Sequence, residues 1–325
     1  MLRAEDWHEL VSIRSLPMDD TDRVRRIAAE QVLVPAMAIA ERWDVLHNLA
    51  NRGPALTFTP SVLTLHDLIF FREKHLGRFS LLAMQMLTKR AVRAADAVIT
   101  LTAAAREDIL SEFELDPGAV AVVPHGVGRP PTGTVLPEAQ LRQRFSLPES
   151  SRVVLCVAAK RPHKNQQLLL RALGELPDDI SVVCVGHEEG YEGRLRELVS
   201  ELRVADRVRL PAYVPDHELE GLWATAACAA FPTLAEGFGL PVIEAMQRGV
   251  PVACSDIPVL REVGGGAPVY FDPHDPAAAA RAILAAMGNE RCAELGRRRS
   301  AEFSWQRAAE RTLDVYERLA GCTSR

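Results

Sequence analysis

Residues 226–256, AACAAFPTLAEGFGLPVIEAMQRGVPVACSD, contain an apolar run, a glycine-rich loop, a stretch of helical length and a second apolar run. Proline is tolerated in the first turn of a helix, so Pro241 marks a helix start directly after the loop. This order of segments is a strand–loop–helix–strand unit, which is the repeating unit of a parallel sheet with crossover helices. The stretch therefore predicts an α/β fold.

The same alternation continues through the second half of the chain. Apolar, β-branched runs predict strands at 152–159, 179–186, 206–214, 226–232, 249–256 and 267–271. Because these runs are apolar on both faces, we expect all of them to be central strands of a parallel sheet. Helical patterns at 165–176 and 191–204 lie between them and complete a doubly wound domain.

The first half of the chain shows the same pattern with fewer elements. Strands are predicted at 43–49, 61–68, 97–102 and 120–126, with a further candidate at 9–15, and helices at 21–43 and 77–96. Glycine and proline in 126–140 predict an interdomain linker, and 305–319 predicts a last amphipathic helix. We therefore divide the chain into an N-terminal Rossmann-like domain (1–130), a second domain (131–304) and a C-terminal helix (305–325) that could cross back to the first domain.

Composition narrows the class of protein. At ~150 residues per domain, 325 residues correspond to about two domains. A net charge of −5 and a pI near 6.0 argue against a protein that coats nucleic acid, which needs a basic face. No apolar run approaches the ~20 residues of a membrane helix, and the first residues lack the order of a signal peptide, so we expect a cytoplasmic protein. Four cysteines lie in apolar runs and are predicted to be buried thiols: Cys156, Cys184, Cys228 and Cys254.

The loop and helix start at 236–244 carry the sharpest chemical pattern. Gly237 and Gly239 have no side chain, so backbone N–H groups before the helix can approach a ligand closely. Free N–H groups and the positive end of a helix dipole bind anions such as a diphosphate. Glu236 and Glu244 would repel that anion unless they bind neutral hydroxyl groups, and a nucleotide-sugar supplies both. The alternative is that both glutamates are solvated, as acidic residues near a helix start often are.

The stretch AEGFGLPVIEAMQRGVPVACSDIPVLREV (235–263) resembles the donor-site signature of the retaining glycosyltransferases of family 4, which have the GT-B architecture. The likeness continues through VVLCVAAKRPHKNQQLLLRAL (153–173), AYVPDHELEGLWATAACAAFPT (212–233), VITLTAAAREDIL (98–110), VVPHGV (122–127) and TLHDLIFF (64–71). A GxGxxG fingerprint is absent from the sequence, which disfavours a nicotinamide-dependent oxidoreductase. The resemblance implies two Rossmann-like domains that face each other across a cleft.

The resemblance also implies a role for each part of the signature. The carboxylate of Glu236 would contact hydroxyl groups of the donor sugar, and that of Glu244 would hold the ribose. The backbone of the loop would face the sugar and the diphosphate, through Gly237, Phe238, Gly239 and Leu240. The nucleobase would lie between the ends of two strands, at Val185, Gly186, Tyr213 and Val214.

In the family the lysine of the K-N step contacts the donor phosphates, and Lys164 occupies that position here. Its ammonium can neutralise a leaving diphosphate without a metal ion. Many family members carry an arginine six residues before this lysine, where this chain has Ala158. Lys160 or Arg161 could take over its task. A solvated lysine at a helix start is the alternative interpretation of Lys164.

In the first half, His66 matches a histidine that lines the sugar cleft of the family. It lies at the carboxyl end of a predicted strand, where open α/β sheets bind ligands, and it could orient the acceptor. A structural histidine is the alternative, and His125 is a weaker candidate for the cleft. The histidines have no metal-ligand spacing, so we assign no metal and no cofactor besides the donor substrate.

The N-terminal part departs from the family pattern. Residues 1–52 contain no glycine, whereas family members open with a strand and a glycine-rich loop, and 28–51 resembles a part normally well inside the domain. We therefore expect an incomplete N-terminal domain. A nucleotide-sugar-binding remnant, or one half of a complex with no activity alone, stays open as an alternative. The basic and apolar segment 71–95 leaves a peripheral contact with an anionic membrane surface open as well.

Taken together, the motifs favour an enzyme that moves a hexosyl unit from a nucleoside-diphosphate sugar to a hydroxyl acceptor with retention at the anomeric carbon. The segment KRPHKN (160–165) resembles a variant common among polysaccharide mannosyl- and rhamnosyltransferases. A mannose-, rhamnose- or glucose-like donor and a saccharide or lipid-linked saccharide acceptor are therefore expected. No nucleic-acid partner is expected.

Overall fold

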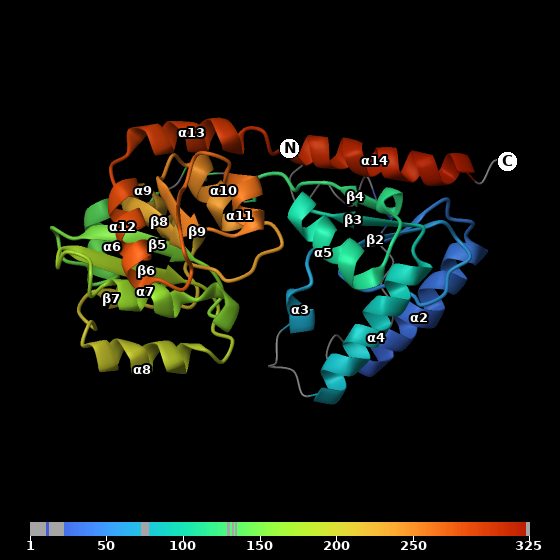
Figure 1. Cartoon of the computed structure of the whole chain (residues 1–325), viewed down its shortest axis with the longest axis horizontal. Coiled ribbons are helices and arrows are strands. Elements are labelled where there is room, and N and C mark those ends of the chain that lie inside the picture. Colours follow the sequence, from blue (N-terminus) through green and yellow to red (C-terminus); the bar gives the residue numbers. More distant parts are fainter. Residues whose placement is uncertain are drawn as a thin grey trace.

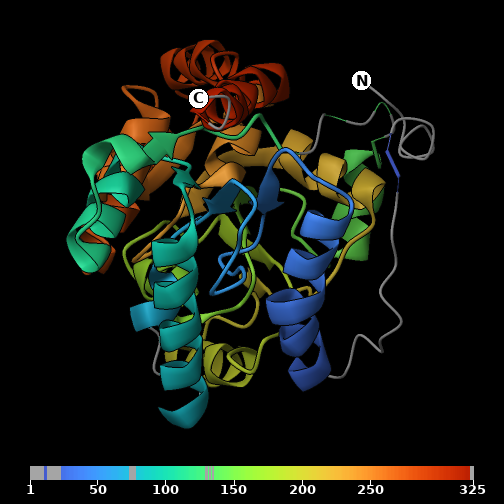
Figure 2. The same cartoon turned by 90° about the vertical axis from the view of Figure 1, so that its right-hand side faces the viewer.

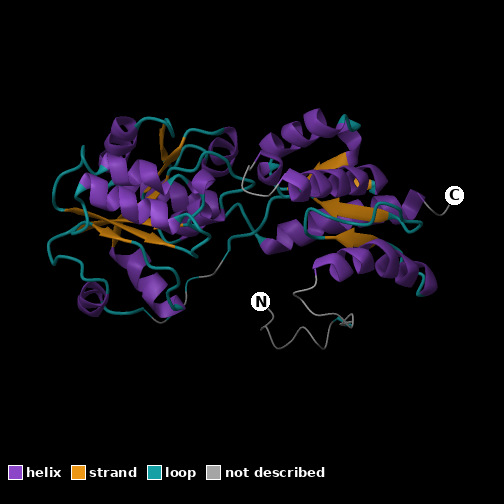
Figure 3. Cartoon of the chain, turned by 90° about the horizontal axis from the view of Figure 1, so that it is seen from below, coloured by secondary structure: helices purple, strands orange, loops and turns teal. Residues whose placement is uncertain are grey.

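The computed structural model describes residues 11–12, 23–72, 78–128, 131, 133 and 135–322. These residues form two α/β domains, each built on its own parallel sheet, with helix α14 (Trp305–Cys322) lying across the top of the N-terminal domain (Figure 1). Viewed from below, the two sheets are separate and are joined by loops (Figure 3). The α/β interpretation is confirmed, while the candidate strand at 9–15 lies largely outside the described residues.

The N-terminal domain contains a four-stranded sheet in the order β1-β2-β3-β4, and all neighbouring strands are parallel. Its strands are β1 (Leu46–Asn48), β2 (Ser61–Thr64), β3 (Ala97–Thr100) and β4 (Val120–Val122). Its helices are α2 (Arg23–Ala40), α3 (Ile69–Arg72), α4 (Arg78–Ala94) and α5 (Ala103–Phe113), with the short turn η1 (Pro117–Ala119). The strands follow chain order, so a crossover of the chain precedes each new strand.

Helices α4 and α14 lie on opposite sides of this sheet, and strand β2 contacts both sides. Val62 of β2 packs with Val315 of α14, whereas the next residue, Leu63, packs with Val92 of α4. Figure 2 shows α2 and α4 below the sheet, apart from each other, with α14 above it. The segment 71–95 thus contributes a helix that packs on the sheet, and no helix among the described residues is long and apolar enough to cross a membrane.

The second domain contains a six-stranded parallel sheet in the order β10-β9-β8-β5-β6-β7. The strands are β5 (Arg152–Val157), β6 (Ile180–Val185), β7 (Val208–Arg209), β8 (Ala226–Phe231), β9 (Val252–Ser255) and β10 (Val269–Phe271). β5 and β8 are neighbours, although β6 and β7 lie between them in the chain. The strand order therefore reverses at this pair, and open α/β sheets bind ligands outside the carboxyl ends of such strands.

Helices cover both faces of this sheet. They are α6 (Glu138–Arg144), η2 (Pro162–Lys164), α7 (Gln166–Ala172), α8 (Glu192–Leu202), α9 (Asp216–Thr225), α10 (Leu240–Gln247), α11 (Pro258–Gly264), α12 (Pro276–Ala286) and α13 (Glu290–Ser300). Leu155 belongs to the apolar cluster on one face and Cys156 to the cluster on the other. The prediction of buried thiols is confirmed for the four cysteines named above.

Two of the predicted strands do not have the predicted central position in the sheet. The runs at 206–214 and 267–271 form β7 and β10, which are the two edges of the sheet and not central strands. The first run is also much shorter as a strand, because only Val208–Arg209 pairs with β6. Both strands are only partly buried, because an edge strand has no neighbour on one side.

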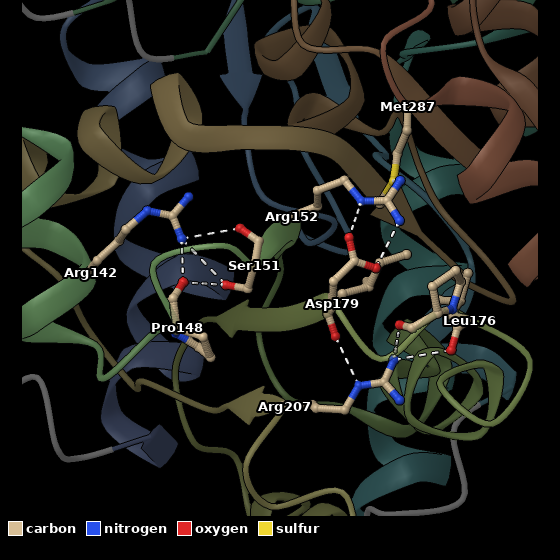
Figure 4. A network of polar contacts seen from close by, with 10 residues as sticks. Arg142, Pro148, Ser151, Arg152, Leu176, Asp179, Arg207 and Met287 are labelled. Carbon is tan, nitrogen blue, oxygen red and sulfur yellow. Dashed lines mark hydrogen bonds and ion pairs between the residues drawn. The ribbon is translucent and has the colours of Figure 1, made fainter.

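Arginines fix the amino ends of the strands, at the edge opposite the carboxyl ends. Arg152 binds both carboxylate oxygens of Asp179, with Nε–Oδ2 and Nη2–Oδ1 distances of 2.8 and 2.9 Å (Figure 4). Arg207 donates from Nη2 to the carbonyl oxygens of Leu176 (3.2 Å) and Pro177 (2.6 Å). Because Arg152 begins β5 and Arg207 directly precedes β7, this network is a structural one that aligns strands.

Helix α14 is attached to the N-terminal domain through two partly buried histidines. His47 of β1 is hydrogen-bonded to the hydroxyl of Tyr316 through Nδ1 and to Thr64 Oγ1 (2.7 Å) through Nε2. His125, which follows β4, packs on Trp305 with ring centroids 5.0 Å apart. Burial lowers the pKa of both histidines to about 4, and the neighbouring His66 adds to the effect at His125.

We expect these histidines to make the fold sensitive to acid. Their pKa in the folded state, about 4, lies below the ordinary value of 6.5, so the unfolded chain binds protons more readily between these values. Stability is thus fully present above about pH 6.5 and falls as the pH drops toward 4. The melting temperature measured from pH 7.5 to 4.5 should fall less steeply in His125→Asn than in the wild type, and the exposed-residue control His274→Gln should follow the wild type.

Candidate functional site

Lys164 and Glu236 meet at the point where the strand order reverses. Lys164 follows β5 and Glu236 follows β8, so both lie at carboxyl ends of neighbouring strands. Nζ of Lys164 is 2.7 Å from Oε1 of Glu236, and the two side chains are only 18% and 13% exposed. The structure therefore brings together the two residues that were predicted to bind the phosphates and the sugar.

The position of Lys164 is set by the next residue. Asn165 has a left-handed backbone (φ 55°), which asparagine tolerates better than most residues. Its Nδ2 donates to the carbonyl oxygens of Pro232 (3.0 Å) and Pro273 (2.9 Å), which ties the loop after β5 to the loop after β8. The hydroxyl of Thr233 donates to the carbonyl oxygen of His163 (3.0 Å) and strengthens the same link. The K-N step is therefore a structural unit, although only its lysine was predicted to act.

The glycine-rich loop leads into α10 as predicted. Gly239 has a φ of 91°, a conformation that favours glycine, and α10 begins at the next residue with Pro241 in its first turn. Gly237 lies against the N-terminal domain: a Cβ placed on it would be 2.8 Å from the carbonyl oxygen of His66 and 2.9 Å from Oδ2 of Asp67. The loop therefore touches the other domain at a point where only a glycine fits.

The two glutamates of the signature lie in different surroundings. Glu236 shares a small cavity with Lys164, together with Ala158, Thr233 and Gly239 among its lining residues. Glu244, on α10, directs its carboxylate at Gly128 of the interdomain linker, where a Cβ on the glycine would overlap with Oε1. This difference agrees with two separate partners for the two carboxylates.

The predicted base site lies at the carboxyl ends of β6 and β7. The side chains of Val185 and Val214 belong to the apolar core, so only their backbone can face a ligand. Gly186 lies so close to the carbonyl oxygen of Ala158 that a Cβ there would overlap with it. Tyr213 is 64% exposed and its ring stacks with that of His187, with ring centroids 6.4 Å apart. This pair gives the site a flat aromatic edge.

Lys160 does not replace the arginine that the family carries near Ala158, and that part of the expectation was wrong. The Lys160 side chain is fully buried, and its Nζ donates to the carbonyl oxygens of Gly186 (2.6 Å) and Pro211 (2.9 Å). Arg161 forms an ion pair with Glu189 on the surface. Lys160 therefore connects the two chain segments that follow β6 and β7, at the predicted base site.

His66 lies at the domain boundary, where it was predicted. Its Nε2 is 2.9 Å from the carbonyl oxygen of Leu49, and its backbone N–H donates to Oδ1 of Asn51 (2.7 Å). Its ring contacts that of His125 edge to face, and His125 in turn contacts Phe238 of the donor loop, with centroid distances of 5.6 Å in both cases. The weaker candidate His125 thus links the cleft of one domain to the loop of the other.

Sequence reasoning passed over Asp67 as a site residue. Its Oδ1 accepts a hydrogen bond from the backbone of Ile69, and burial raises its pKa, with the charge of Glu236 adding to the effect. Asp67 and Glu236 line the same cavity of about 450 Å³ between the domains. The position of Asp67 directly after His66 in the HDL segment was the sequence feature that could have identified it as a site residue. In the part of the chain that the structure describes, no group of three or more potential ligands could hold a metal ion.

Two facing domains, each with a parallel sheet, and a glycine-rich loop between β8 and α10 of the second domain are features of the GT-B class of glycosyltransferases. The model of the glycosyl transferases group 1 matches residues 137–302, and the model of glycosyltransferase family 4 matches residues 2–128. The chain therefore belongs to the group 1, or family 4, glycosyltransferases.

Individual proteins agree with this assignment. The chain is 26% identical over 215 residues to the O-antigen chain mannosyltransferase RfbU of Salmonella typhimurium, which covers 66% of this chain and 57% of the relative. Sucrose-phosphate synthase from Thermosynechococcus elongatus has a similar fold, with a TM-score of 0.73, 20% identity and coverage of 96% of this chain and 83% of that one. HepE of Anabaena, solved in complex with UDP and glucose, gives a TM-score of 0.68 at 20% identity, covering 88% and 80%. The matched stretch spans about half the length of several curated relatives.

Proposed function

We propose that the protein transfers a hexosyl unit from a nucleoside-diphosphate sugar to a hydroxyl acceptor, with retention at the anomeric carbon, in the biosynthesis of a polysaccharide or glycoconjugate. The Lys164–Glu236 pair at the reversal of strand order carries this proposal. It offers one cation for a diphosphate and one carboxylate for sugar hydroxyls within a single small cavity. The sugar is mannose-, rhamnose- or glucose-like, as the mannosyltransferase relative supports.

In this reaction the bond between the anomeric carbon and the diphosphate oxygen breaks, and the acceptor oxygen bonds to that carbon from the same face. The acceptor proton passes to an oxygen of the departing diphosphate. Lys164 and the amides at the start of α10 balance the negative charge that grows on the diphosphate, without a metal ion. His66 and Asp67 face the donor loop from the other domain, where they can bind hydroxyl groups of the acceptor.

Titration calorimetry with UDP, GDP and ADP in the presence of a chelator tests the donor site. We expect one of these nucleotides to bind, and Glu244→Ala to weaken it by roughly 1–3 kcal/mol, the range for losing a hydrogen bond to a charged group. Glu149→Ala, an exposed change in the same domain, serves as the control. No binding of any of the three nucleotides would refute the donor site. Binding with neither transfer nor hydrolysis of the matching donor would favour the alternative, a nucleotide-sugar-binding protein that is inactive alone.

A further inference from the structure

The N-terminus of helix α5 is completed by a residue from the other domain. Thr102, fully buried, accepts a hydrogen bond at Oγ1 from the backbone N–H of Ala105 (3.1 Å). The two N–H groups before it, of Ala103 and Ala104, donate to Oε1 (2.7 Å) and Oε2 (3.0 Å) of Glu262. Three of the four amides that a helix start leaves without a backbone partner in the helix are thus bound, two of them by one carboxylate.

The charges of the two partners are complementary. The first turn of α5 contains no acidic residue of its own, so no side chain of that turn offsets the positive end of the helix dipole. Glu262 lies on α11 of the second domain, 159 positions along the chain from Ala103. A carboxylate that accepts two amides at a helix start forms stronger, charge-assisted hydrogen bonds than a neutral group would.

Glu262 is itself held firmly within the second domain. Arg299 of α13 donates from Nη2 to the carbonyl oxygen of Glu262 (2.6 Å) and from Nε to that of Val263 (3.0 Å). This arginine also lies over the ring of Phe303, with Cζ 5.0 Å from the ring centroid. The carboxylate therefore extends from a rigid part of the second domain, and binding it fixes one domain against the other.

The contact lies close to the candidate site. Helix α5 follows β3 directly, and β3 pairs with β2, after which His66 and Asp67 occur. Thr102 also approaches the donor loop, with its Oγ1 3.4 Å from the carbonyl oxygen of Gly237. Any separation of Glu262 from α5 would move His66 and Asp67 away from Glu236.

We infer that Glu262 is a positioning residue that holds the N-terminal domain closed on the donor loop during glycosyl transfer. Interfaces between domains of one chain are usually polar and allow relative motion, so a specific contact is needed to favour one arrangement. This role rests on the proposed function, because the closed arrangement matters only if donor and acceptor meet between the domains. Glu262 touches neither of them.

The test compares Glu262→Ala with Asp275→Ala in the full-length chain. Asp275 also accepts hydrogen bonds from two amides at a helix start, those of Ala277 and Ala278, but within one domain. Asp275→Ala therefore removes a helix cap, as Glu262→Ala does, without removing a contact between the domains. We expect Glu262→Ala to increase the radius of gyration in small-angle X-ray scattering and to lower kcat roughly tenfold or more. Nucleotide affinity should stay as in the wild type, because the nucleotide contacts lie in the second domain. Asp275→Ala should change none of these quantities.

A second variant, Glu262→Gln, keeps one acceptor oxygen without the charge and should fall between the wild type and Glu262→Ala in both kcat and radius of gyration. The inference would be overturned if Glu262→Ala had the radius of gyration and the kcat of the wild type. It would also be overturned if Glu262→Ala and Asp275→Ala had equal effects. If the wild type binds no nucleotide, the proposed function fails, but the scattering comparison still decides whether Glu262 holds the domains together.

Discussion

Replacing Glu236 by glutamine is expected to lower kcat by about 10²- to 10³-fold, the range seen when an electrostatic contact to the reacting centre is lost. In the proposed reaction, positive charge develops on the sugar as the diphosphate leaves, and the Glu236 carboxylate would stabilise that charge. Binding of the bare nucleoside diphosphate should be at least as tight as in the wild type. Nζ of Lys164 is 2.7 Å from Oε1 of Glu236, so the carboxylate would compete with the phosphates for the same ammonium.

Kinetics with saturating donor and calorimetry with the nucleotide alone separate these two effects. Glu138→Gln is the matched control, because Glu138 also forms an ion pair, with Arg142, but on the surface of the second domain. A loss of nucleotide affinity in Glu236→Gln equal to that in Glu244→Ala would contradict the division of roles between the two glutamates. The melting temperature of each variant shows whether a change in kcat reflects unfolding.

The fold of this protein could be predicted from its sequence because both sheets are covered by helices on both sides. Continuous apolar runs such as 226–232 then mark the strands, and glycine and proline mark the loop and helix start that follow. The order of the strands across the sheet could not be predicted from the sequence in this way. Val208–Arg209 and Val269–Phe271 are edge strands that are only partly buried, although the runs around them, 206–214 and 267–271, contain enough apolar residues to suggest central strands. The order of strands across a sheet is set by hydrogen bonds between backbone groups, and these groups are nearly the same in every residue type.

The candidate site could be predicted for those residues that belong to a short sequence motif and have a side chain suited to binding the substrate. Lys164 and Glu236 are 72 positions apart, yet each follows a strand, and the reversal of strand order brings them together. The position of Lys160 could not be predicted, because a lysine beside a loop is usually solvated and this one is fully buried under two carbonyl groups. Glu262 could not be predicted either, since its partner is the backbone of a helix in the other domain. Contacts of a side chain with a distant backbone have no signature in residue types.

Replacing Gly237 by alanine is expected to lower kcat by about 10²-fold, the cost of displacing reacting groups by about 1 Å. The new methyl group would be 2.8 Å from the carbonyl oxygen of His66 and 2.9 Å from Oδ2 of Asp67. The first of these is a backbone atom at the end of β2 and cannot turn aside, so the domains must move apart. The radius of gyration should increase.

Gly266→Ala is the matched control, because a Cβ at that glycine has no neighbour within 4 Å. Full activity in Gly237→Ala would show that the loop and the N-terminal domain do not need this close approach for transfer. The double variant Gly237→Ala/Glu262→Ala connects this result to the role of Glu262. Effects of residues that act through one contact are not additive. Once the methyl group separates the domains, Glu262 can no longer reach the N-terminus of α5, so the double variant should be no slower than Gly237→Ala alone.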